Sequence, residues 1–263
     1  MTDPVQGRHT WTAARLLKGM LATQCLLALL VVMGDLPRDI LDDLPWSQPR
    51  PPTTELPVTP GNQTRQFEPR RLPMEQPTGP GFPLEEFAPS RLEFTSANLG
   101  GYENAVLLTG AIAEGDAERF GDWLKGLATT PEAFALHSPG GAVDEALRIG
   151  RIIRTTGLPV MVTVGASCFS ACPYILAGGL KREVSRQALV GVHQHYFGTN
   201  TYLPAFLLVS DIQVGQGEVM SYLAEMGIDP MIMVKALITP PDDIYILVPE
   251  ELERFGLSTS LTE

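Results

Sequence analysis

The chain has 263 residues, of which 44% are hydrophobic and 19% charged, a composition typical of one folded domain with additional segments. Asp and Glu number 30 against 19 Lys and Arg, so the net charge is -11. We expect no nucleic acid partner, because an acidic chain offers no cationic surface to a phosphate backbone. The three cysteines lack the Cys and His clusters of a structural zinc site, and we expect no metal and no cofactor.

Residues 1–34 predict a cytoplasmic flank and a membrane anchor. Gly19 to Gly34 is a run of 16 residues without a charged side chain, near the shortest length that spans a bilayer once the preceding leucines are included. The basic residues before the run are Arg8, Arg15 and Lys18. They predict that the N-terminus stays in the cytoplasm and that the chain after Asp35 emerges on the other face. A cleaved signal peptide is the main alternative, although no small-x-small cleavage pattern follows, and a buried core helix is the other.

Residues 35–92 contain 13 of the 23 prolines of the chain. Proline removes backbone donors and favours extended neighbours, so the segment predicts a flexible linker rather than a compact fold. A proline-rich docking motif for a partner is the alternative.

Residues 93–263 alternate short apolar runs with amphipathic stretches, which is the pattern of an α/β domain. The expected strands are Arg91–Ala97, Asn104–Leu108, Ala133–His137, Val160–Val164 and Leu189–His193. The expected helices are Ala113–Leu127, Ala142–Thr156, Ala171–Gly178, Pro204–Met226 and Pro249–Phe255.

Three segments of this domain carry side chains or turns suited to catalysis. In the first, Gly140 and Gly141 stand where a strand gives way to a helix, and paired glycines can aim backbone N–H groups at an oxyanion. In the second, Ser170 stands at the start of an expected helix, where its hydroxyl lies beside unpaired backbone N–H groups and the small Ala171 leaves room for a substrate carbonyl. The bland alternatives are an ordinary strand-to-helix turn and a serine that only caps a helix.

The third segment contains His193 and His195, two of only four histidines. Histidine titrates near neutrality and is the common general base for a serine. The two side chains share a face if the strand continues, but no nearby acidic or cysteine ligand favours a metal site.

In this order the three segments resemble the Clp protease proteolytic subunit and its membrane-anchored relatives such as signal peptide peptidase A. The stretch LHSPGGAVDEALRIGRII is similar to the family's oxyanion segment, SCFSACPYILAGGLKR to its nucleophile segment and VGVHQHYF to its histidine strand. VSDIQVGQGEVMSYLAEMGID is similar to the long helix between subunits, and ILVPEELERFGLST to the closing segment. The resemblance covers about residues 93–258.

The resemblance implies a fold of the Clp protease and crotonase type, a spiral of strand-strand-helix units. It implies a serine peptidase in which His193 takes a proton from Ser170 while backbone N–H groups hold the oxyanion. The oxyanion donors are the N–H groups of Gly140 and Ala171, and Gly141 belongs to the same oxyanion hole. Ser167 is the competing nucleophile. The family's likeness also implies a homo-oligomer and a polypeptide substrate.

The third member of the triad is where the sequence departs from the family. Counted back from Phe255, the family's aspartate falls on Ile244, one residue beyond Asp243. We therefore assign Asp243 through a local shift, with Asp242 next, and a weakened triad as the remaining alternative. Both aspartates also fit the end of a turn after two prolines.

Cys168 and Cys172 flank the proposed nucleophile. In an oxidising compartment they can form a disulfide that braces the turn, provided that Cys168 lies before the helix begins. Two reduced and buried cysteines are the alternative.

Together these expectations describe a serine endopeptidase anchored in the bacterial inner membrane by one helix, with its catalytic domain on the periplasmic side. No Gly-x-x-x-x-Gly-Lys-Ser/Thr loop occurs, so an unfolding motor would be a separate protein. One rival is a catalytically weakened scaffold or binding protein of the membrane. Another is acyl-CoA chemistry of the crotonase kind, which the serine and histidine pairing disfavours.

Overall fold

The computed structural model describes residues 13–34, 59–69, 88–195 and 205–263. The chain divides into two compact units, Met1–Pro51 and Pro52–Glu263. We call the second unit the head.

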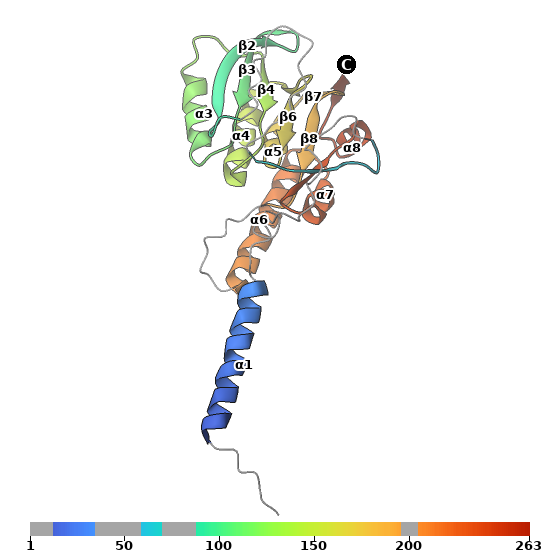
Figure 1. Ribbon diagram of the computed structural model, residues 1–263. Helices are drawn as coiled ribbons and strands as arrows, with labels where there is room; N and C mark the ends of the chain where they lie inside the picture. Colours follow the sequence, from blue (N-terminus) through green and yellow to red (C-terminus); the bar gives the residue numbers. More distant parts are fainter. Residues whose placement is uncertain (1–12, 35–58, 70–87, 196–204) are drawn as a thin grey trace, which may run out of the picture. The chain divides into compact units, whose positions relative to one another are not determined.

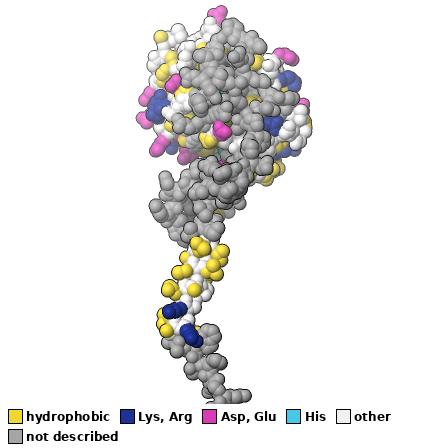
Figure 2. Space-filling model, in the orientation of Figure 1, with side chains coloured by type: hydrophobic (Ala, Val, Ile, Leu, Met, Phe, Trp, Pro, Cys, Tyr) yellow, Lys and Arg dark blue, Asp and Glu magenta, His cyan; other side chains and the backbone are white. Residues whose placement is uncertain are grey.

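The first unit contains one described helix, α1 (Ala13–Gly34). Its window Ala14–Val31 has a mean hydropathy of 1.5, and none of it is buried. Hydrophobic side chains cover the helix, and Lys and Arg lie at one end (Figure 2). The helix is therefore long and apolar enough to cross a membrane, as the uncharged run predicts.

A six-stranded sheet forms the larger layer of the head, in the order β10-β7-β5-β4-β3-β2 (Figure 1). The hairpin of β2 and β3 is antiparallel, and every other neighbouring pair is parallel. All five residues of β4 are buried, as expected for a central strand covered on both faces. The strands are β2 (Glu93–Leu99), β3 (Tyr102–Thr109), β4 (Ala133–His137), β5 (Val160–Val162), β7 (Arg182–Ser185) and β10 (Ser260–Thr262).

A smaller mixed sheet, of order β1-β9-β8-β6, contains the strands that precede Ser170 and His193. Strand β6 is parallel to β8, whereas β9 is antiparallel to both β8 and β1. The strands are β1 (Thr64–Gln66), β6 (Ser167–Phe169), β8 (Leu189–Val192) and β9 (Asp243–Ile246). The α/β class predicted from the alternating pattern is confirmed.

Three helices, α3, α4 and α5, lie side by side against the sheets (Figure 1). At the crossing of α4 and α5, Gly150 and Gly178 bring the two backbones together so closely that a Cβ at Gly178 would overlap the Gly150 carbonyl. This contact fixes the end of α5 against α4. The helices of the head are α3 (Asp116–Lys125), α4 (Val143–Thr156), α5 (Cys172–Ala177), α6 (Ala205–Glu225), α7 (Ile232–Ile238) and α8 (Pro249–Arg254).

Part of the proline-rich segment belongs to the head. The sequence predicts no compact structure over 35–92, yet Thr64–Gln66 forms strand β1 on the edge of β9. Residues 61–68 contain no proline between Pro60 and Pro69, so every backbone donor needed for a ladder is present. The free edge of β9 supplies the partner that the local sequence does not reveal.

Candidate active site

Ser170 occupies a strained turn between β6 and α5. Its φ is 59°, and it is the one residue other than glycine with a positive φ in the described part of the chain. Its N–H donates to the Gly191 carbonyl oxygen at 3.0 Å, which ties the turn to β8. A serine held in left-handed backbone between a strand and a helix projects its hydroxyl outward, as in a nucleophile elbow.

The hydroxyl of Ser170 meets His193, which directly follows β8. Nε2 of the imidazole lies 2.7 Å from Ser170 Oγ, and Nδ1 lies 2.9 Å from the carbonyl oxygen of Pro241. A carbonyl can only accept, so Nδ1 carries the proton and Nε2 accepts from the serine hydroxyl. Burial lowers the pKa of His193, although the Pro241 and Asp243 backbone and the charge of Asp242 oppose this. A neutral imidazole oriented in this way has the geometry to accept the proton of the Ser170 hydroxyl as a general base.

Asp243 is the first residue of β9 and pairs with Gln66 of β1. Its N–H donates to the Pro240 carbonyl oxygen at 3.0 Å, and its side chain is half-buried. Asp242 is exposed. Within the described residues neither carboxylate forms a hydrogen bond with His193, whose Nδ1 is held by the backbone of the same loop.

The turn with paired glycines lies directly against the Ser170 turn. Gly140 has a φ of 93°, and a Cβ there would lie 2.6 Å from Ser170 Cβ and 2.8 Å from Ala171 N. Gly141 has a φ of 144°, and the backbone of Ile112 leaves no room for a Cβ there. Only glycine fits this close approach of two backbones.

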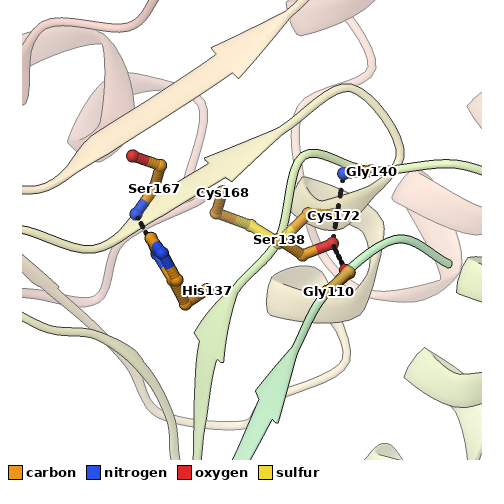
Figure 3. Close-up of a disulfide and its surroundings, with 7 residues drawn as sticks. All are labelled: Gly110, His137, Ser138, Gly140, Ser167, Cys168 and Cys172. Carbon is orange, nitrogen blue, oxygen red and sulfur yellow. Dashed lines mark hydrogen bonds between the residues drawn. A yellow bond between two sulfur atoms is a disulfide. The ribbon is translucent and has the colours of Figure 1, made fainter. Parts of the chain in front are cut away.

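The N–H groups around Ser170 differ in whether they are already bonded. Gly140 donates to Ser138 Oγ at 3.1 Å, and Ser138 in turn donates to the Gly110 carbonyl oxygen at 2.6 Å (Figure 3). The N–H groups of Gly141 and Ala171 donate to no other described residue. Of the paired glycines, Gly141 is therefore the one with an N–H left for an oxyanion, together with Ala171.

Ser167, the competing nucleophile, lies away from the base. Its side chain is fully buried and its Oγ has no partner in the described residues, while its N–H donates to His137 Nδ1 at 3.0 Å (Figure 3). The structure therefore brings Ser170, and not Ser167, to His193.

Cys168 and Cys172, on either side of the Ser170 turn, form a disulfide. Cys168 lies in β6 and Cys172 begins α5, with 5.1 Å between their Cα atoms (Figure 3). Both side chains are fully buried. The condition that Cys168 precede the helix is met, and the cross-link closes a loop around Ser170.

His195 does not reach the reacting groups. Its Nε2 lies 2.9 Å from the hydroxyl of Tyr174, a buried residue of α5. Burial lowers the pKa of His195, and the neighbouring His193 lowers it further. Among the described residues no group of three His, Cys, Asp or Glu side chains is placed to hold a metal.

Two functional contacts have little signal in the sequence. The Pro241 carbonyl is a backbone group, so no residue pattern marks it. Phe67, just after β1, places its ring centroid 4.6 Å from that of His193, edge to face, and 6.3 Å from that of Phe169. Its only signal is an isolated aromatic side chain within a segment rich in proline.

Comparison with models of known protein families and with curated proteins finds no match to this chain.

Proposed function

We propose that the chain is a membrane-anchored serine peptidase with a fold of the Clp protease and crotonase type. The observation that carries the proposal is the 2.7 Å contact between Ser170 Oγ and His193 Nε2 at a strained strand-to-helix turn. A serine that only caps α5 would be expected to bond to the helix N–H groups, whereas within the described residues Ser170 Oγ bonds to His193 Nε2.

In the proposed reaction, Ser170 Oγ attacks the carbonyl carbon of a peptide as its proton passes to His193 Nε2. The N–H groups of Gly141 and Ala171 receive the developing negative charge on the carbonyl oxygen. His193 then gives the proton to the leaving amine, and a water repeats the sequence on the acyl-enzyme. The Pro241 carbonyl stabilises the imidazolium in each step, with Asp242 adding a favourable charge.

We place the head on the periplasmic side of a bacterial inner membrane, with extended polypeptides as substrates. Homo-oligomerisation is part of the proposal. It is supported by exposed apolar side chains on α6, on α7 and just before α7, namely Val209, Val214, Met220, Met231, Val234, Leu237 and Ile238.

Labelling with a fluorophosphonate probe tests the proposal in the full chain purified in detergent. We expect labelling of the wild type and of Ser167→Ala, none of Ser170→Ala, and labelling of His193→Ala slower by about 1,000-fold or more. Labelling that survives Ser170→Ala but vanishes in Ser167→Ala would overturn the assignment. An unlabelled wild type would instead favour the second candidate function.

That second candidate is a catalytically weakened scaffold or binding protein. The observation that favours it is the absence, among the described residues, of a carboxylate bonded to His193. Without one, the imidazolium formed during attack is stabilised less strongly.

A further inference from the structure

Residues 63–67, which we call the strap, belong to the proline-rich segment and contact the loop before β9 that contains Pro241 and Asp242. Strand β1 pairs antiparallel with β9, with Arg65 opposite Ile244. At one end the Ile246 N–H donates to the Gln63 carbonyl oxygen at 2.9 Å, and at the other the Phe67 N–H donates to the Asp242 carbonyl oxygen at 2.8 Å. The strap is thus bonded along its whole length.

Buried polar contacts hold the first residue of the strap. Gln63 is 8% exposed, and its Nε2 donates to the Ile246 carbonyl oxygen at 3.1 Å and to Glu251 Oε2 at 2.6 Å. The other carboxylate oxygen of Glu251 accepts from the Tyr245 hydroxyl at 2.8 Å and pairs with Lys235 Nζ at 3.2 Å. A buried amide with these partners is costly to displace, so the strap is a fixed part of the head.

The last residue of the strap lies at the catalytic imidazole. The Phe67 ring meets His193 edge to face and also contacts Phe169, which directly precedes Ser170. The Phe67 N–H holds the carbonyl of Asp242, and the preceding carbonyl, of Pro241, accepts from His193. The side chain of Phe67 therefore contacts the His193 ring, and its backbone N–H binds the loop whose Pro241 carbonyl orients that ring.

We propose that the strap positions the general base, with Phe67 as a positioning residue that covers the His193 ring and, through the Asp242 carbonyl, fixes the peptide next to the Pro241 carbonyl that holds its Nδ1. This inference rests on the proposed peptidase function for its catalytic consequence. Its geometric content, an imidazole shielded by Phe67, is independent of that function.

Removing the ring exposes His193 to water. Because burial is the main cause of its lowered pKa, exposure moves the pKa back toward the ordinary value for histidine. The titratable and charged groups near His193 are Ser170 at Nε2, Asp242 and Asp243 in the loop, and His195 on its own strand segment. None of them is altered by a substitution at Phe67.

The test compares Phe67→Ala with Phe67→Leu and with the exposed strap variant Thr64→Ala, in the full chain in detergent. Imidazole titration is followed by NMR of 13C-labelled histidine, and His193→Gln identifies the His193 signal. In Phe67→Ala we expect a higher His193 pKa and fluorophosphonate labelling slower by about 10-fold or more. We expect Phe67→Leu to recover most of both properties and Thr64→Ala to match the wild type.

The His137 signal reports folding in the same spectra, because burial lowers the pKa of that residue to about 4. A Phe67→Ala protein with a native His137 signal but an unchanged His193 pKa and labelling rate would overturn the inference. If the native His137 signal is lost in Phe67→Ala, that variant has not folded and Phe67→Leu becomes the test. A folded Phe67→Leu protein whose His193 pKa is as high as that of an exposed histidine would also overturn the inference. A wild type that is not labelled, yet shows the expected shift of the His193 pKa, would refute the peptidase and leave the strap in place.

Discussion

The Pro241 carbonyl oxygen accepts the Nδ1–H of His193 at 2.9 Å, in the position where the triad of serine peptidases has a carboxylate. A carbonyl fixes the tautomer and the ring plane as a carboxylate does, but it brings a dipole rather than a full charge. The reactivity of Ser170 should therefore depend on the loop backbone more than on either aspartate.

This relationship predicts that Asp243→Asn and Asp242→Asn each slow fluorophosphonate labelling by less than about 10-fold, since neither side chain bonds to the imidazole. His193→Ala should slow it by about 1,000-fold or more, as expected for loss of a general base. Single-exponential labelling rates at pH 7.5 provide the comparison. A loss in Asp243→Asn as large as that in His193→Ala would mean that the carboxylate moves onto the imidazole in the reactive state.

The backbone strain at Ser170 predicts a difference between two inactive variants. Ser170→Gly and Ser170→Ala both lack the hydroxyl, but only glycine adopts a φ of 59° without steric cost. We expect Ser170→Gly to have the higher free energy of unfolding, because relief of the strain is worth about 1 kcal/mol. The greater flexibility of glycine in the unfolded chain reduces this difference. Urea unfolding of the full chain in detergent, followed by tryptophan fluorescence, measures the difference. Equal stabilities would argue against strain at this residue.

Buried His137 predicts that the head loses stability as the pH falls. Its side chain is 1% exposed, and burial lowers its pKa from 6.5 to about 4. Between these two values the unfolded chain binds a proton that the folded chain does not, so the free energy of unfolding decreases with falling pH. The full shift corresponds to about 3 kcal/mol, lost between about pH 6.5 and pH 4.

The control for this prediction is His137→Asn, which keeps an acceptor for the Ser167 N–H but does not titrate. It should be less stable than the wild type at pH 7.5 and should lose less stability on acidification. His193 and His195 titrate in both proteins and contribute in the same direction, because their pKa values are also lowered. An identical pH dependence in the two proteins would contradict the buried neutral state of His137.

The disulfide predicts a definite thiol count. In protein purified without reductant, only the exposed Cys25 should react with iodoacetamide under denaturing conditions, whereas all three cysteines should react after reduction. Peptide mass spectrometry distinguishes the sites. Alkylation of Cys168 and Cys172 in the unreduced protein would show that they are thiols.

The sequence predicts the larger elements well, because periodic apolar residues dominate them. The expected strand Ala133–His137 coincides with β4, and the expected helix Pro204–Met226 differs from α6 by one residue at each end. Strand β6 is not among the expected strands, since Ser-Cys-Phe is too short to alternate and is stabilised by β8 rather than by its own composition. Helix α7 was missed for a similar reason, because its apolar residues lie close to a pair of prolines.

In the candidate site, the functional side chains could be predicted from the sequence, whereas the functional backbone groups could not. Ser170, His193 and the glycine turn are chemically distinctive residues, and order along the chain was enough to group them. The acceptor of Nδ1 is a carbonyl that any residue can supply, and the donor choice between Gly140 and Gly141 depends on the Ser138 hydroxyl. Neither is encoded in residue type, so both require the folded geometry.

The acceptor of the imidazole comes 48 residues after His193 in the chain. During synthesis or export from the N-terminus, serine and histidine therefore emerge well before the loop that sets the histidine's tautomer. A chain that ends before β9 therefore lacks the carbonyl that fixes the imidazole, so Ser170 and His193 become aligned only once β9 has joined the smaller sheet.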